Sequence, residues 1–146
     1  MLTPGLLLKG RYEIEMFVGQ GGMGVVYRAH DSWHARAVAI KQLRSDSPDL
    51  RELFVAQTDR LSHLHHPSLP HSIEFFSEGG ETYQVMEFVP GDDLSVQLAR
   101  RGSPFPARQV VHWAVDLLGL VSYLHGREPP IIHRDIKPSN IKLGAA

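Results

Sequence analysis

The stretch GQGGMG at residues 19–24 is followed directly by VVY at residues 25–27, and this order decides the fold. The first six residues fit the spacing G-x-G-x-x-G, which dinucleotide-binding proteins also use. In those proteins the last glycine opens a helix, whereas Val25, Val26 and Tyr27 are β-branched or aromatic and favour a strand. The sequence therefore predicts a glycine-rich hairpin tip whose backbone N–H groups can approach phosphate oxygens. The simpler alternative is a plain tight turn.

Segments rich in β-branched and aromatic residues lie on both sides of this tip. The predicted strands are Tyr12 to Val18, Val25 to Ala29, Ala37 to Leu43, Ile73 to Ser77 and Thr82 to Val89. Between the third and fourth strands, apolar residues recur at helical spacing from Leu50 to Leu64, until Pro67 ends the pattern. The first part of the chain therefore predicts five strands and one amphipathic helix.

After Pro90 and Gly91 the pattern becomes helical. A short helix is predicted from Leu94 to Arg101, because Gly102 can end it. A longer helix begins at Pro106, and its broad apolar stripe indicates that most of the surface of this helix is buried. The stripe consists of Val110, Val111, Ala114, Leu117, Leu118, Val121 and Leu124. Pro129 and Pro130 break this helix, and a polar loop then runs over residues 133–140.

The composition is that of an ordinary globular protein. The 146 residues are 42% hydrophobic and 21% charged, so at least one packed core is expected. The net charge of −1 gives no reason to expect nucleic acid or a membrane surface as a partner. The early apolar run Leu6 to Leu8 is too short for a signal peptide or a membrane span, and there is no cysteine. We therefore expect a cytoplasmic protein.

Lys41 closes the run VAIK at residues 38–41 on the third predicted strand. Strand alternation places Val38 and Ile40 on one face of the sheet, and Ala39 and Lys41 on the other. Taken alone, Lys41 has the pattern of a solvated strand lysine. Because it follows the glycine hairpin, we predict instead that it neutralises phosphate charge.

A third motif, HRDIKPSN at residues 133–140, forms a dense polar loop between two apolar segments. The glycine loop, the VAIK lysine and this loop, in that order, resemble the signature of the protein kinases. The lysine two residues after Asp135 is similar to the serine/threonine branch, and the glycine loop to its bacterial members. The resemblance runs from Tyr12 to the C-terminus.

The resemblance implies an α+β, protein-kinase-like fold within a partial kinase domain over residues 1–146. The N-lobe, residues 11–89, would be a five-stranded antiparallel sheet with one long helix. Residues 90–146 would form the hinge exit, the first helices and the catalytic loop of an incomplete helical C-lobe.

The resemblance also implies an activity, the phosphorylation of serine or threonine hydroxyls of a protein substrate with ATP and Mg²⁺ as cofactors. Asp135 would accept the proton of the attacking hydroxyl, Lys137 would steady the transferred phosphoryl group, and Asn140 would bind magnesium. The residues implied in nucleotide binding are the loop glycines Gly19, Gly21, Gly22 and Gly24, the adenine neighbours Val18, Val26 and Ala39, the gatekeeper Met86, the hinge residues Glu87 and Val89, Asp93 at the ribose, and Lys41 at the phosphates.

Two features depart from the family pattern. The helix glutamate that pairs with the strand lysine is replaced by Gln57, and a neutral amide attracts Lys41 less than a carboxylate would. The sequence also contains no Asp-Phe-Gly, so the implied second magnesium ligand is missing. We therefore expect phosphoryl transfer by these residues to be nearly abolished, and the chain to be a marginal, aggregation-prone fragment.

Three functions remain open: a truncated kinase, a nucleotide-binding pseudokinase, and a non-catalytic interaction module. The intact Asp135, Lys137 and Asn140 favour the first function, whereas Gln57 favours the second. A separate histidine cluster, His63, His65, His66 and His71, raises the alternative of a zinc site, but ligand spacing with a fourth partner is not evident.

Overall fold

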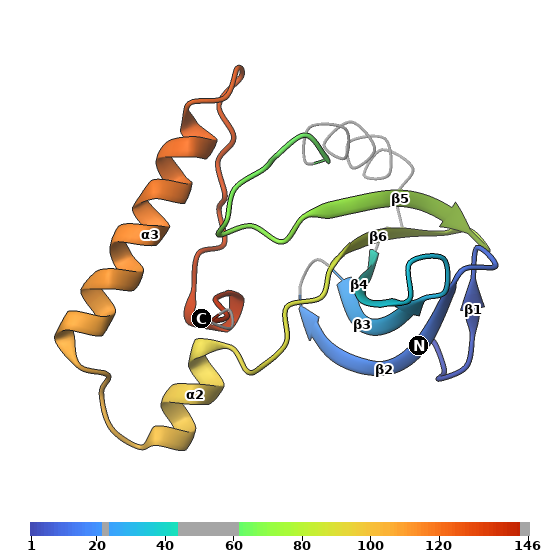
Figure 1. Cartoon of the computed structure of the whole chain (residues 1–146), viewed down its shortest axis with the longest axis horizontal. Helices are drawn as coiled ribbons and strands as arrows, with labels where there is room; N and C mark the ends of the chain where they lie inside the picture. Colours follow the sequence, from blue (N-terminus) through green and yellow to red (C-terminus); the bar gives the residue numbers. More distant parts are fainter. Residues whose placement is uncertain (22–23, 44–61, 144–146) are drawn as a thin grey trace. The chain divides into compact units, whose positions relative to one another are not determined.

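A computed structural model of the chain describes residues 1–21, 24–43 and 62–143 (Figure 1). The chain divides into two compact units, a sheet unit of residues 1–65 and 70–88 and a helical unit of residues 66–69 and 89–146. Most of the helix expected between Leu50 and Leu64, including Gln57, lies outside the described residues.

The sheet unit is built on a six-stranded antiparallel sheet in the order β1-β2-β3-β4-β6-β5. The strands are β1 (Leu7–Leu8), β2 (Tyr12–Gly21), β3 (Gly24–Asp31), β4 (Arg36–Leu43), β5 (Ser72–Glu78) and β6 (Glu81–Glu87). All five predicted strands are confirmed, with ends that differ by a few residues. The sixth strand, β1, was not predicted.

β1 joins the sheet through a tight turn at Lys9 and Gly10. Both residues have positive φ, 54° and 61°, and the Arg11 N–H donates to the Leu8 carbonyl at 3.0 Å. This is the pattern of a type I′ turn, whose twist matches that of a two-stranded ribbon. The turn brings Leu8 opposite Tyr12 and buries it to 4% exposure, so residues before the first predicted strand belong to the core.

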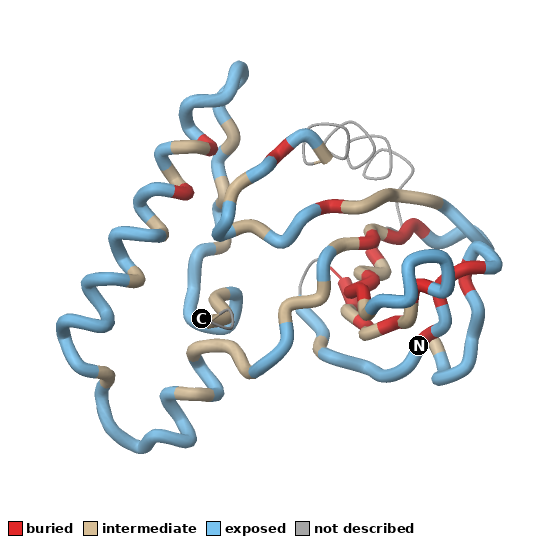
Figure 2. The backbone as a smooth tube through the Cα atoms, viewed as in Figure 1, coloured by how far each residue is buried: buried red, intermediate tan, exposed pale blue. Residues whose placement is uncertain are grey.

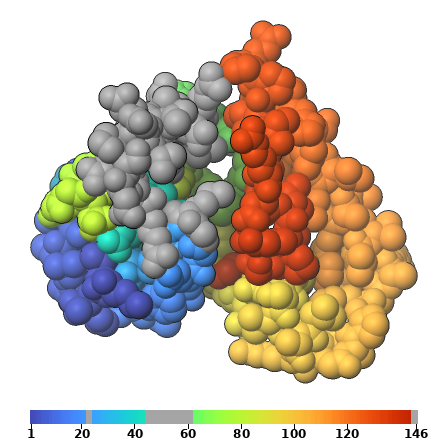
Figure 3. Space-filling model, turned by 180° about the vertical axis from the view of Figure 1, so that it is seen from behind, coloured from blue at the N-terminus to red at the C-terminus, as the bar shows by residue number. Residues whose placement is uncertain are grey.

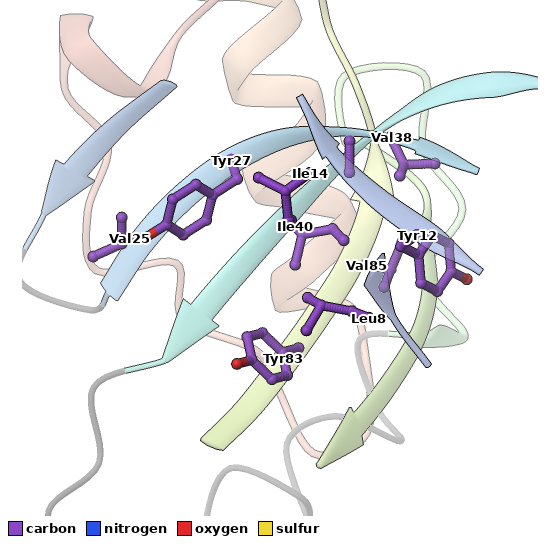
Figure 4. Packing of buried hydrophobic residues seen from close by; sticks show 10 residues of the cluster. Leu8, Tyr12, Ile14, Val25, Tyr27, Val38, Ile40, Tyr83 and Val85 are labelled. Carbon is purple, nitrogen blue, oxygen red and sulfur yellow. The ribbon is translucent and has the colours of Figure 1, made fainter. Parts of the chain in front are cut away.

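The core lies on one face of this sheet (Figure 4). Val38 and Ile40 of β4 and Val85 of β6 are fully buried there, because alternate residues of a strand point to the same face. The other buried members of the cluster are Leu8, Tyr12, Ile14, Val25, Tyr27, Ala29 and Tyr83. The prediction that Val38 and Ile40 share one face of β4, opposite Ala39 and Lys41, is therefore confirmed.

A buried ion pair holds the β1–β2 turn to the end of β3. The Arg11 guanidinium donates from Nε and Nη2 to the two carboxylate oxygens of Asp31, both at 2.7 Å. Asp31 is fully buried and Arg11 is 7% exposed. Asp31 also accepts from the Trp33 N–H at 3.1 Å, and Arg11 contacts Glu74 at 3.1 Å. The Arg11 hydrogen bonds hold the pKa of Asp31 well below its usual range, so this buried carboxylate is ionised.

The helical unit contains α2 (Leu94–Arg101), α3 (Ala107–His125) and the short 3₁₀ helix η1 (Pro138–Asn140). The predicted bounds of α2 are confirmed: Asp93 caps its first turn and Gly102, with φ 65°, ends it. The segment after α3 returns to α2, where the Leu94 N–H donates to the Ile141 carbonyl at 2.8 Å. Figure 3 shows this segment lying against α2.

The prediction that most of the surface of α3 is buried is wrong for the residues described. Only Leu120 and Leu124 are buried, whereas Val111 is 62% exposed and Leu118 is 67% exposed (Figure 2). An apolar stripe becomes buried only where another element packs on it, and the stripe alone does not specify that element. Within this unit, the Ile131 N–H donates to the Leu124 carbonyl, at the end where α3 is buried.

Replacing Asp31 with Asn should lower the free energy of unfolding by about 3–5 kcal/mol, because it leaves the Arg11 guanidinium buried without a counter-charge. The measurement is urea unfolding at neutral pH. The control is Asp92→Asn, which removes an exposed pair with Arg100 and should cost at most about 1 kcal/mol.

This stabilisation should also depend on pH. Because folding lowers the pKa of Asp31, its contribution is present above the unfolded pKa of about 3.9 and is lost as the pH falls through the folded pKa. The difference between wild type and Asp31→Asn should therefore shrink in acid. Equal effects of Asp31→Asn and Asp92→Asn at neutral pH would contradict the role assigned to the buried pair.

Candidate active site

The predicted adenine and phosphate residues of the sheet unit come together on one face. In the β3–β4 pairing Val26 lies opposite Lys41, and in the β4–β6 pairing Ala39 lies opposite Met86. Residues directly opposite in antiparallel strands share a face, and Ala39 and Lys41 share theirs by alternation. These four residues therefore lie on the face opposite Val38 and Ile40, away from the buried core.

Val18 lies at an irregularity in β2. The β2–β3 register shifts between Phe17 and Gly19, so Val18 has no partner on β3, and the residue is 40% exposed. A bulge bends its strand and re-aims the side chain at the extra residue. Simple alternation along β2 therefore does not predict which way Val18 points.

The glycines of the loop differ in what they allow. Gly21 pairs with Gly24 where β2 and β3 meet, and Gly22 lies outside the described residues. Gly24 has φ 144°, and a Cβ there would lie 2.2 Å from the Gln42 carbonyl oxygen, so only glycine fits. A Cβ at Gly19 or Gly21 would meet no described atom within 4 Å. Gly24 is thus required by the sheet itself, whereas Gly19 and Gly21 leave open space beside the backbone.

The predicted hinge residue Glu87 ends β6, and it forms two hydrogen bonds with His71. The Glu87 N–H donates to the His71 carbonyl at 2.9 Å, and its carboxylate accepts from the His71 N–H at 3.3 Å. Any backbone contact from Glu87 to a ligand must therefore use its carbonyl. Glu87 also borders a hollow of about 340 Å³, lined in addition by Arg36, Ala37, His71, Ile73 and Phe88.

In the helical unit, residues 133–140 fold back on themselves around Asp135. Lys137 Nζ lies 2.9 Å from one carboxylate oxygen of Asp135, and Asn140 Nδ2 donates to the other at 2.7 Å. The same Asn140 nitrogen donates to the Asp135 carbonyl at 2.8 Å. Pro138 favours the 3₁₀ turn that brings Asn140 back to Asp135, since proline fits the first position of a helical turn. The three predicted residues of this loop are therefore in direct contact.

The backbone of this loop is strained at one position. Arg134 has φ 64°, in the left-handed region that non-glycine residues seldom adopt. Such a conformation costs on the order of 1–3 kcal/mol and persists only where the surroundings impose it. It places Asp135 directly after a sharp change of chain direction, between His133 and Lys137.

The contacts of Asp135 determine its charge state. The hydrogen bond from Lys137, and next the one from Asn140, hold the pKa of Asp135 below its usual range. The side chain is still 38% exposed. At neutral pH the loop therefore presents an ionised, accessible carboxylate beside a cation.

Asp93, the residue predicted to lie at the ribose, has a structural role in this chain. Its Oδ1 accepts from the Ser95 N–H at 2.9 Å and the Val96 N–H at 3.0 Å, which caps α2. The hydrogen bond from the Ser95 hydroxyl, with these amide bonds, lowers the pKa of Asp93. The capping bonds use one carboxylate oxygen, so the other is the atom to consider for a ribose hydroxyl.

The predicted histidine cluster does not assemble in the way a metal site requires. The ring of His65 lies 5.1 Å from that of His71, and the ring of His66 lies 5.1 Å from that of Tyr123. Over residues 1–21, 24–43 and 62–143, no group of three or more His, Asp or Glu side chains is placed to hold a metal ion. The same ranges contain no helix with the length and hydropathy needed to cross a membrane.

Residues 12–144 match the protein kinase domain family, and the chain therefore belongs to that family. Serine/threonine-protein kinase C of Synechocystis sp. is 37% identical over an alignment that covers 100% of this chain and 29% of that protein. The probable serine/threonine-protein kinase YbdM of Bacillus subtilis is 33% identical, with 96% of this chain and 55% of that protein covered. The chain thus spans about a third to about half of the length of these relatives.

Solved structures give the same fold. The kinase domain of Mycobacterium tuberculosis PknI superposes with a TM-score of 0.81 at 24% identity, over 96% of this chain and 57% of that one. The apo form of PpkA-294 has a TM-score of 0.81 at 25% identity, over 99% and 58%. The expectation of a partial protein-kinase fold is therefore confirmed.

Replacing Lys137 with Met should raise the pKa of Asp135 towards the value of an ordinary aspartate, because it removes the largest cause of the lowered value. The measurement is a titration of the ¹³C carboxyl signal of Asp135 by NMR. Arg108→Met, which removes an exposed positive charge on α3, is the control and should leave the titration unchanged. An unshifted titration in Lys137→Met would show that Lys137 does not set this pKa.

Proposed function

We propose that this chain provides the nucleotide-binding lobe and the catalytic loop of a serine/threonine protein kinase. Such an enzyme transfers the γ-phosphoryl group of ATP to a serine or threonine hydroxyl of a protein substrate. The observation that carries the proposal is the arrangement around Asp135, whose carboxylate is bound by Lys137 and Asn140. An accessible, ionised carboxylate can accept the hydrogen bond of a hydroxyl and then its proton.

The shared face of β3, β4 and β6 supports a nucleotide as the other substrate. Val26, Ala39 and Met86 offer apolar surface for a purine ring, and Lys41 on the same face offers positive charge for its phosphates. The open space beside Gly21 allows its backbone to approach a phosphate oxygen. In this proposal Glu87 contacts the purine through its carbonyl.

Asn140 fits the role of a magnesium ligand. Because its Nδ2 donates twice to Asp135, the amide oxygen Oδ1 is the atom that can bind a cation. Magnesium prefers such oxygen ligands and keeps several waters, so one protein ligand is compatible with binding through nucleotide phosphates. When bound, the ion neutralises charge on the β- and γ-phosphates.

The loop residues divide the work of phosphoryl transfer between them. Asp135 orients the substrate hydroxyl and receives its proton, while Asn140 holds the Asp135 carboxylate in place. Lys137 lies 2.9 Å from the same carboxylate and supplies positive charge for the transferred group. Since the transition state is loose and highly charged, positioning and charge stabilisation supply most of the rate enhancement.

A second candidate function is nucleotide binding without efficient transfer, as in a pseudokinase. One sequence observation favours it: Gln57 stands where the family has a glutamate. We therefore expect these residues to bind ATP and to transfer its phosphoryl group slowly.

Gly21→Ala should weaken the binding of Mg·ATP at least about tenfold without lowering the melting temperature by more than a few degrees. The added Cβ meets no described atom within 4 Å in the free protein, but it occupies the space that a phosphate oxygen needs. The measurement is isothermal titration calorimetry together with a thermal melt. Unchanged affinity would remove the loop from the nucleotide site, and a large loss of stability would show that Gly21 is required by the fold.

Transfer itself is tested by incubating the chain with radiolabelled ATP and casein, with Asp135→Asn as the matched control. A rate for wild type that is low but above that of Asp135→Asn supports the kinase function, since a general base contributes about 10²–10⁴-fold. Equal rates, with ATP binding intact in both proteins, support the pseudokinase.

A further inference from the structure

Arg28 carries a positive charge on the face of the sheet that holds the candidate nucleotide residues. In the β3–β4 pairing it lies opposite Ala39, and in the β4–β6 pairing Ala39 lies opposite Met86, so the three residues share a face. The guanidinium carbon of Arg28 lies over the ring of Phe88, 5.4 Å from its centroid, and Nε lies 3.2 Å from Oε2 of Glu15. All of these residues belong to the sheet unit.

The sequence of β4 allows Arg28 to reach Phe88. Ala39 lies opposite Arg28, and Ala37 is the next residue of β4 on the same face. Both side chains are single methyl groups, which leave room for an arginine to cross the strand. A guanidinium within about 6 Å of a ring centroid is attracted by the negative face of the ring. Arg28 therefore restrains the Phe88 ring.

Phe88 follows Glu87, whose carbonyl contacts the purine in the proposed function. That carbonyl belongs to the planar peptide unit that joins Glu87 to Phe88, so its direction depends on the backbone of both residues. On the Glu87 side, the N–H and the carboxylate form hydrogen bonds with the backbone of His71. On the Phe88 side, the ring lies under the Arg28 guanidinium. The peptide unit is therefore held at both of its ends.

We propose that Arg28 is a positioning residue that keeps the Glu87 carbonyl in the direction needed to accept a hydrogen bond from the 6-amino group of adenine. The inference rests on the proposed function. The 6-amino group is the only N–H donor of the adenine base in ATP, so it is the group from which a carbonyl can accept. In this role Arg28 acts through Phe88 and needs no contact of its own with the nucleotide.

The experiment compares Mg·ATP with the magnesium complex of purine riboside 5′-triphosphate by isothermal titration calorimetry. This analogue carries hydrogen in place of the 6-amino group, so its affinity does not depend on the direction of the Glu87 carbonyl. Wild type should bind ATP roughly tenfold more tightly than the analogue, which corresponds to one hydrogen bond.

Arg28→Met should narrow this preference by about two- to fivefold and leave the affinity for the analogue unchanged. The Arg28 side chain is 39% exposed, and a cation–π contact at an exposed site contributes that much. Phe88→Leu, which removes the ring and keeps an apolar side chain, should narrow the preference equally, and the double variant should narrow it no further. The control is Arg108→Met, the same change at an exposed arginine of α3, which should alter neither affinity.

The outcomes separate this inference from the proposed function. If wild type binds neither nucleotide, the proposed function fails, and if it binds both equally, the Glu87 contact of that proposal fails together with this inference. If wild type prefers ATP and neither Arg28→Met nor Phe88→Leu narrows the preference, the inference alone is overturned. Equal losses of affinity for both nucleotides, or additive effects in the double variant, would overturn it as well, because Arg28 would then not act through Phe88 on the carbonyl.

Discussion

The pairing of β3 with β4 is the constraint on which the sheet unit depends. With Val26 opposite Lys41, every second residue of β4 faces the core and the residues between them face the candidate nucleotide site. A shift of one residue would exchange the two faces and bury Lys41 in place of Ile40. Gly24 permits this register at the end of the strand, because a Cβ there would lie 2.2 Å from the Gln42 carbonyl oxygen and only glycine fits. The register therefore places Ile40 in the core and Lys41 on the opposite face of β4.

Asp31 and Asp135 are both held ionised, but by different arrangements. Asp31 is fully buried, and the bidentate Arg11 guanidinium together with the Trp33 N–H balances its desolvation. Asp135 is 38% exposed, and its partners Lys137 and Asn140 come from the next five residues of its own loop. The first carboxylate has no access to a ligand and serves the fold. The second keeps an accessible surface, which is what a reacting group needs.

Local sequence signals were sufficient for most elements and for placing Asp135, Lys137 and Asn140 in one polar loop. The strands follow from β-branched and aromatic runs, and α2 from its Asp93 cap and its Gly102 stop. The convergence of Asp135, Lys137 and Asn140 lies within eight consecutive residues, so the motif alone brings them together. A zinc site and the burial of α3 both depend on contacts with residues outside the local segment, and a local pattern does not specify those contacts.

Contacts between distant segments could not be predicted in this way. The Arg11–Asp31 pair joins two turns 20 residues apart, and the hydrogen bond from Lys142 Nζ to the Val89 carbonyl spans 53 residues. In the sequence, Asp31 has the pattern of an ordinary turn residue, and Lys142 that of a lysine in an apolar segment. The run Leu6 to Leu8 followed by Lys9 and Gly10 did carry a signal for β1, an apolar segment before a turn glycine. Its length of two strand residues is below what periodicity can detect.

The lowered pKa of Asp135 limits what the carboxylate can do in the proposed reaction. A carboxylate stabilised by Lys137 and Asn140 is a weaker base than a free aspartate, and neither is basic enough to remove a proton from an unreacted hydroxyl. A loose transition state does not require this, because the hydroxyl forms little bond to phosphorus before the old bond has largely broken. The proton becomes acidic only as the new bond forms, and a weak base already in position can then accept it. Lys137 therefore costs Asp135 basicity that the proposed reaction does not need, and its ammonium keeps a positive charge 2.9 Å from the reacting carboxylate of that proposal.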